Sequence, residues 1–176
     1  ENTVINENDG KYTFIDFNRN EKAMAGLFEG FVRNFYKKEQ SYFKVRREDI
    51  RWKAVPVENS DASLLPKMQT DITLECYNKK IVMETKYYKQ TLASNYSEKF
   101  HSTNLYQIYS YLRNLEEDTS NPNNKNCEGM LVYPTVQKEI KEGYQMGNHK
   151  IRIATVDLSK DWNRIHSRLI HLISQN

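Results

Sequence analysis

Apolar residues recur every three or four positions in three stretches of the chain, and this spacing predicts three helices. The stretches are residues 18–40, 102–117 and 159–176, and Ser102 or Thr103 is the expected N-cap of the second. In each stretch the apolar residues form one stripe, as in a helix that covers a core with one face. The expected buried residues are Met24, Leu27, Phe28, Phe31, Val32 and Phe35 in the first helix, Leu105, Ile108, Tyr109, Leu112 and Leu115 in the second, and Ile165, Leu169, Leu172 and Ile173 in the third.

Between the helices, runs rich in β-branched and aromatic residues predict strands. The runs cover residues 41–55, 67–76, 80–88, 130–136 and 149–158, and the first of them is basic enough to be a charged strand or hairpin. The run at 130–136 is apolar enough to be buried on both faces. The order of helices and strands predicts an α/β fold, with a mixed central β-sheet flanked by helices.

The chain divides into a polar N-terminal segment, residues 1–20, and a single domain over residues 21–176. The first ten residues are polar, and we expect them to be frayed. With 176 residues, the chain is large enough for one core. Because the sequence starts without Met, we expect it to be the C-terminal part of a longer protein.

Charge and cysteine content narrow the function without naming it. A formal charge of +3 permits a nucleic-acid partner but does not require one. Cys76 and Cys127 form no CxxC pair, and no apolar run is long enough to span a membrane, so we expect a reduced, cytoplasmic protein without a membrane partner. The sequence lacks a GxxxxGK[ST] loop, so this chain is not expected to bind GTP itself.

The stretch LECYNKKIVMETKYYK, residues 74–89, predicts a hairpin that brings charged residues together. With a two-residue turn at Asn78-Lys79, Asp71 lies directly across from Lys86 and diagonal to Glu84. The other side of this hairpin is almost wholly apolar, with Ile72 opposite Thr85, Leu74 opposite Met83 and Cys76 opposite Ile81.

Two carboxylates beside one lysine have two interpretations. They are the ligands that Mg²⁺ takes while it keeps water and phosphate oxygens, and a nearby ammonium can orient an attacking water. The same three residues also make up an ordinary cross-strand cluster of ion pairs on a solvated face. Each such pair stabilises the fold by less than about 1 kcal/mol.

Asp71, a step of 13 residues to Glu84, and then Glu84-Thr85-Lys86 resemble the D…(D/E)xK signature of the PD-(D/E)XK nucleases, although Thr70 stands where that name has Pro. The blocks LLPKMQTDITL, IVMETKYYK and KFHSTNLYQIYSYL, with GLFEGFVRNFY before them, are similar to the nuclease domain of McrC-type subunits of McrBC-like restriction systems. The resemblance implies a restriction-endonuclease-like core.

The resemblance also assigns roles to individual residues. Asp71 and Glu84 would hold Mg²⁺, or Mn²⁺ as a substitute, and Lys86 would assist the attacking water. Gln107 and Tyr111 match a QxxxY element that contacts the DNA backbone or steadies the lysine; the alternative is an exposed polar pair. Two further residues are candidates: Glu29 for the metal, unless it is simply solvated, and Lys89 for a DNA phosphate.

The function implied is that of a Mg²⁺-dependent endonuclease subunit. It would cut double-stranded DNA in a GTP-dependent, modification-directed restriction system after activation by a separate McrB-type AAA+ GTPase. Two alternatives stay open: a catalytically silent nuclease-fold module that binds DNA or a partner, and a stand-alone repair-type nuclease. The basic runs KVRREDIRWK and KKEQSYFK either follow a phosphate backbone or are solvated ends of elements.

Overall fold

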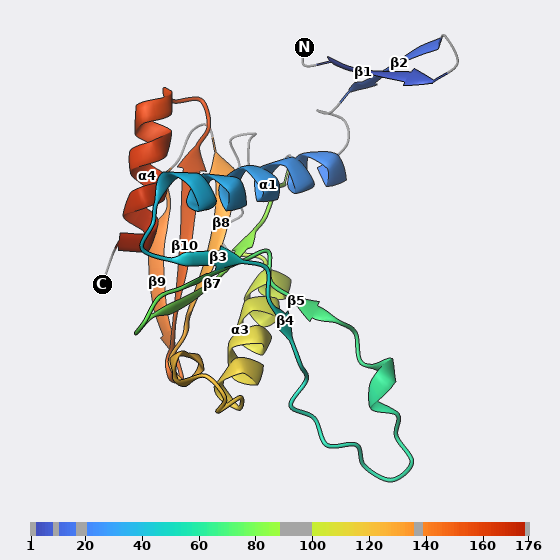
Figure 1. Ribbon diagram of the computed structural model, residues 1–176, viewed down its shortest axis with the longest axis vertical. Helices are drawn as coiled ribbons and strands as arrows, with labels where there is room; N and C mark the ends of the chain where they lie inside the picture. The colour runs from blue at the N-terminus through green and yellow to red at the C-terminus, as the bar shows by residue number, and fades with distance from the viewer. Residues whose placement is uncertain (1–2, 9–10, 17–20, 89–99, 136–138, 175–176) are drawn as a thin grey trace.

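The computed structural model describes residues 3–8, 11–16, 21–88, 100–135 and 139–174. Within them, a six-stranded sheet in the order β3-β6-β7-β8-β10-β9 forms the centre of the molecule (Figure 1). β7, β8 and β10 run parallel, and the other pairings are antiparallel. The mixed sheet confirms the predicted α/β class. The strands are β3 (Lys44–Arg46), β6 (Ile72–Glu75), β7 (Lys80–Thr85), β8 (Glu128–Thr135), β9 (Lys141–Met146) and β10 (His149–Asp157).

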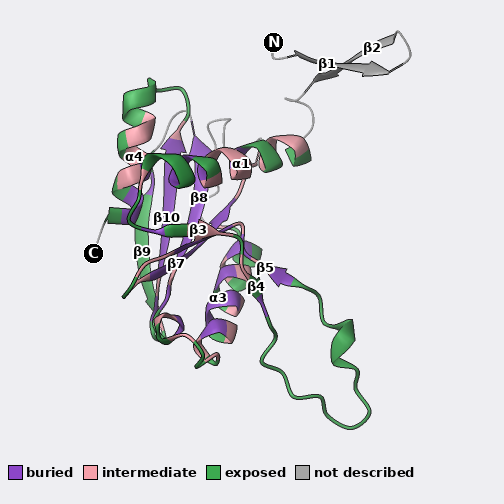
Figure 2. Cartoon of the chain, in the orientation of Figure 1, coloured by how far each residue is buried: buried purple, intermediate pink, exposed green. Residues whose placement is uncertain are grey.

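Helices cover both faces of this sheet and create two apolar layers. α1 (Glu21–Glu39) and α4 (Trp162–Ser174) pack on one face, where Ile81 and Met83 of β7 join their core. α3 (Ser102–Glu116) packs on the other face, against Val82 and its neighbours. β7 and β8 are buried along nearly their whole length (Figure 2), as predicted for the run at 130–136.

The buried helix faces differ from the prediction at single positions. Leu27 is 59% exposed, whereas Tyr36 is fully buried and donates a hydrogen bond to the main-chain oxygen of Leu169 (2.9 Å). In α3, Tyr109 is exposed. The expected N-cap was also wrong, because α3 begins at Ser102 and the capping position is His101, whose side chain makes no capping hydrogen bond.

One pair of strands forms a separate small sheet, and one strand at the edge of the main sheet was not predicted. β1 (Thr3–Asn8) and β2 (Lys11–Asp16) pair antiparallel, so the opening segment is not frayed throughout as expected. β9 was missed by the sequence analysis because its residues are exposed and do not alternate in hydrophobicity.

A small sheet projects a long loop away from the body of the protein (Figure 1). It consists of β4 (Asp49–Ile50) and β5 (Met68–Gln69), and the loop over residues 51–67 contains the short 3-10 helix η2 (Ala62–Leu64). The predicted strand 67–76 is therefore divided: β5 ends at Gln69, and β6 starts at Ile72.

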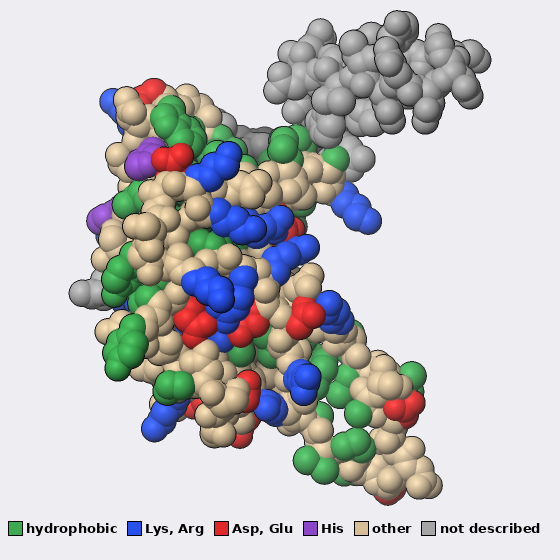
Figure 3. Space-filling view, in the orientation of Figure 1, with side chains coloured by type: hydrophobic (Ala, Val, Ile, Leu, Met, Phe, Trp, Pro, Cys, Tyr) green, Lys and Arg blue, Asp and Glu red, His purple; other side chains and the backbone are tan. Residues whose placement is uncertain are grey.

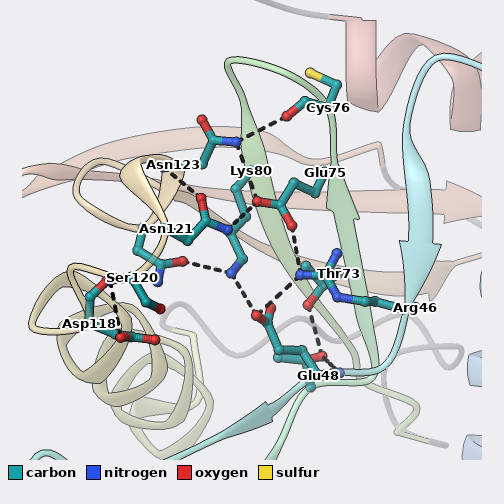
Figure 4. Close-up of polar contacts among 12 residues, drawn as sticks. Arg46, Glu48, Thr73, Glu75, Cys76, Lys80, Asp118, Ser120, Asn121 and Asn123 are labelled. Atoms are coloured by element: carbon teal, nitrogen blue, oxygen red, sulfur yellow. Dashed lines mark hydrogen bonds and ion pairs between the residues drawn. The ribbon is translucent and has the colours of Figure 1, made fainter.

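A polar network around the buried side chain of Lys80 fixes the small sheet to the main one (Figure 4). Its ammonium donates to Glu48 Oε1 and to Asn124 Oδ1, both at 2.7 Å; Asn124 lies in the 3-10 helix η3 (Pro122–Asn124). Glu48 exchanges main-chain and side-chain bonds with Thr70, at 2.9 Å each. Because Thr70 precedes Asp71, this network holds the backbone on which Asp71 is mounted.

Candidate active site

The β6–β7 hairpin brings Asp71 and Glu84 together, although its register differs from the prediction. The turn takes the four residues 76–79 and is closed by a main-chain hydrogen bond of 2.9 Å between its ends, so the pairing shifts by two positions. Continued one step beyond β6, this register puts Asp71 opposite Glu84, where the expected partner was Lys86. A shift of two positions leaves each side chain on its predicted face.

Asp71 lies in the break between β5 and β6, and its backbone is therefore available to other groups. Its main-chain N donates to Glu84 Oε1 (3.0 Å). Its Oδ2 accepts from both the main-chain N (2.8 Å) and the hydroxyl (2.9 Å) of Thr85. Within the described part of the chain, Asp71 Oδ1 makes no hydrogen bond, so one oxygen remains for a ligand.

Lys86 and Gln107 complete a compact group around Glu84. Lys86 Nζ donates to Glu84 Oε2 (3.0 Å) and to Gln107 Oε1 (2.8 Å), and Gln107 Nε2 donates to the same Glu84 oxygen (2.9 Å). Gln107 Nε2 also contacts the hydroxyl of Tyr111 (3.0 Å), which donates in turn to the main-chain oxygen of Gln69 (3.3 Å). The tyrosine is buried, so the alternative of an exposed polar pair was wrong.

Burial and mutual repulsion favour the protonated forms of the two carboxyls. The pKa of Glu84 rises to about 7, first because it is buried and then because Asp71 is close, and Lys86 only partly opposes this. The pKa of Asp71 is also raised by burial, and the hydrogen bond from the Thr85 main chain acts against the rise. The ammonium of Lys86 therefore does not offset both carboxyls, and a cation between the carboxylates would favour their ionised forms.

The donor set fits a magnesium ion. Asp71 Oδ1 is open, and each Glu84 oxygen can accept more than one contact. Nowhere in the described ranges do three or more His, Cys, Asp or Glu residues gather in a way that could hold a metal. A pair of carboxylates with several waters is nevertheless the usual protein contribution to Mg²⁺.

Glu29 binds arginines in this structure and is not a freely solvated carboxylate. Its Oε1 accepts from Arg33 Nη1, one turn along α1, and from Arg47 Nη2 at 2.9 Å. Arg33 Nη1 in turn lies 3.5 Å from the main-chain oxygen of Asp71. The helix carboxylate thus reaches Asp71 through the guanidinium of Arg33, and the expectation that it points directly at a metal has no support in these contacts. Lys89 lies outside the described residues.

Three contributors to the site were missed by the sequence analysis. Thr85 holds Asp71 through its backbone and hydroxyl, and Arg33 and Arg47 hold Glu29. Thr85 was expected on the apolar side of the hairpin, and no spacing rule connects residue 47 with residue 29. Only the position of Arg33 one turn after Glu29 could have been read from the sequence.

Comparison with known proteins gives two findings. Residues 22–134 match the family described as McrBC 5-methylcytosine restriction system component. The Type IV methyl-directed restriction enzyme EcoKMcrBC of Escherichia coli (strain K12) is 35% identical to this chain over 175 residues, which is 99% of this chain and 49% of that protein. The chain thus spans about half the length of this curated relative.

Proposed function

The chain belongs to the family of McrBC 5-methylcytosine restriction system components, as its sequence blocks predicted, and from this membership we propose that it is the Mg²⁺-dependent endonuclease subunit of such a system. The observation that carries the proposal is the contact of Lys86 with Glu84, beside Asp71 with its open oxygen. An ordinary ion pair on a solvated face would not be buried, whereas the Glu84 side chain is 1% exposed and that of Lys86 only 16%.

Each residue of the group has a distinct part in the proposed reaction. Asp71 Oδ1 and Glu84 would hold Mg²⁺, which when bound supplies charge neutralisation at the phosphate and acidifies a water. Lys86 would orient the attacking water and stabilise charge on the phosphate oxygens. Gln107 fixes the ammonium of Lys86 through its Oε1 at 2.8 Å, and Thr85 fixes the Asp71 carboxylate, so that both reacting groups are positioned in advance.

The wider role rests on the family and on the relative. The relative's name describes a methyl-directed restriction enzyme, and the family's description names 5-methylcytosine. We therefore propose double-stranded DNA bearing a modified cytosine as the substrate. The family is described as one component of a restriction system, and we propose that GTP hydrolysis belongs to a separate McrB-type AAA+ partner. In the described residues, none of the helices is both long and apolar enough to cross a bilayer.

A cleavage assay with and without the GTPase partner tests this function. The wild-type protein, Lys86→Ala and the control Lys141→Ala are compared on methylated plasmid, with GTP and either Mg²⁺ or EDTA. Lys141 is exposed on β9 at the far edge of the sheet. We expect Mg²⁺-dependent cutting only with the partner, a loss of ~100-fold or more in Lys86→Ala, and no loss in the control.

Other outcomes identify the alternatives. DNA binding without cutting under any condition would mean a silent nuclease-fold module. Efficient cutting without the partner would mean a stand-alone nuclease. Full activity of Lys86→Ala would remove the proposed mechanism.

A further inference from the structure

The outer face of the small β4–β5 sheet carries basic side chains. Below, the catalytic group means Asp71, Glu84, Lys86 and Gln107. Asp49 pairs with Gln69 and Ile50 with Met68, and the latter pair is buried against the core beneath α3. By strand alternation, Arg47 and Arg51 share the opposite, outward face with Asp49. Figure 3 shows Lys and Arg side chains gathered with some acidic ones between α1 and the base of the projecting loop.

The register brings two like charges together on this face. One step beyond the last paired residues, Arg51 is the position opposite Lys67, by continuation of the observed pairing. Like charges directly opposite each other on a sheet are destabilising. Lys67 is 65% exposed and contacts Asp49 Oδ2 at 3.0 Å, whereas Arg51 is exposed and makes no ion pair with any residue that the structure describes. An anion from outside would relieve this arrangement.

The same face is linked to the catalytic group through Glu29 and Arg33. Arg47 is 46% exposed and contacts Glu29 at 2.9 Å. Burial is the main cause of the raised pKa of Asp71, and the negative charge of Glu29 raises it further. Neighbouring basic residues are committed elsewhere: Arg46 is bound to Glu75 inside the network of Figure 4.

The dimensions of this face suit a nucleic-acid backbone. From Arg47 to Arg51 an extended strand covers ~13 Å, which is the axial rise of about four nucleotides at ~3.4 Å per nucleotide in one DNA strand. The loop beyond carries Glu58 and Asp61 at exposed positions, so the positive charge ends at its base. A duplex reaching the catalytic group could thus be held on one side by this face.

We propose that Arg47, Arg51 and Lys67, which we call the basic face, bind phosphates of the DNA strand beside the cleavage site. This inference rests on the proposed function for the identity of the polyanion. Under this proposal, the basic residues within 44–53 have two different roles. Arg46 is structural, and Arg47 and Arg51 contact substrate.

Salt-dependent DNA binding tests the basic face separately from catalysis. Anisotropy of a fluorescein-labelled DNA duplex is measured with the protein in EDTA, over a series of KCl concentrations. The double variant Arg51→Gln/Lys67→Gln is compared with Lys125→Gln/Lys141→Gln, which removes the same charge from exposed positions that lie in neither basic run. Each lost phosphate contact reduces the slope of log K against log salt by ~0.9, so we expect a reduction of ~1.8 in the first variant and an unchanged slope in the second.

A gain of affinity gives a second readout that misfolding cannot produce. Asp49→Asn removes the carboxylate that contacts Lys67, and we expect this variant to bind the duplex more tightly than the wild type. The basic face is overturned if Arg51→Gln/Lys67→Gln keeps the wild-type slope, if the control loses as much, or if Asp49→Asn does not gain. Because no cutting is involved, a protein that never cleaves but shows the reduced slope would refute the proposed function and leave the basic face in place.

Discussion

Replacing Glu84 by Gln is expected to flatten the dependence of stability on pH. In the metal-free protein the pKa of Glu84 is raised from 4.5 to about 7, chiefly by burial and then by Asp71. Between these two values the folded protein holds a proton that the unfolded chain has already released. The free energy of unfolding therefore falls as pH rises, and the contribution is complete below pH ~4.5 and lost above the folded pKa.

The size of the effect follows from the same interval. At about 1.4 kcal/mol for each pH unit, a rise from 4.5 to about 7 corresponds to a loss of about 3 kcal/mol between acidic pH and pH 8. Asp71, whose pKa is raised as well, contributes in the same direction, so the difference between wild type and variant belongs to the pair. The buried His149 has a lowered pKa and contributes oppositely, but it is present in both proteins and cancels.

Urea unfolding followed by circular dichroism in EDTA measures this effect at several values between pH 4.5 and pH 8. Glu84→Gln places an amide beside hydrogen-bond donors, so the free energy of unfolding will change at every pH. The informative quantity is therefore the slope of the free energy of unfolding against pH. Glu142→Gln, at an exposed position on β9, is the control and should keep the wild-type slope. Parallel curves for wild type and Glu84→Gln would refute the account of a buried, repelled carboxyl.

Three further substitutions test packing and positioning. Lys80→Met should lower the free energy of unfolding by ~3–5 kcal/mol in urea, because Glu48 would be left largely buried without its ammonium; a loss under ~1 kcal/mol would contradict the importance of this network. Gly129→Ala should cost ~1–3 kcal/mol in the same assay, because a Cβ there would lie 2.9 Å from Leu112 Cδ1; an unchanged midpoint would mean that α3 moves freely. Gln107→Ala should reduce Mg²⁺-dependent cleavage by ~10–100-fold while DNA binding is kept, since it removes hydrogen bonds to two charged groups; equal loss of binding would indicate a contact with DNA.

The sequence predicted the faces of the hairpin correctly although its register was wrong. Apolar alternation determines only whether a position is odd or even, and a turn two residues longer than expected leaves this parity unchanged. For this reason Asp71, Glu84 and Lys86 were placed correctly on the side opposite to the apolar pairs. The roles of these side chains as metal ligands and as activator of water stay predictions.

Features that depend on distant partners could not be predicted in this way. The break before β6 is invisible in the pattern, because Thr70 is buried like a strand residue. Leu27 was expected to be buried and is exposed, whereas Tyr36 is buried although it was not expected to be. Which face of α1 is buried depends on where α4 packs, and the sequence of α1 does not contain this information. The contact between Arg47 and Glu29 had no local signal in the sequence, since the two residues lie on different elements.

The division of the predicted strand at residue 70 gives Asp71 a special position. It lies in one of the two short connections, residues 47–48 and 70–71, between the small sheet, which carries the projecting loop, and the six-stranded sheet, which carries Glu84. A force on the projecting loop would therefore act on these two connections. Because Asp71 lies in such a connection and Glu84 lies on β7, rotation of the small sheet would change the separation of the two carboxylates.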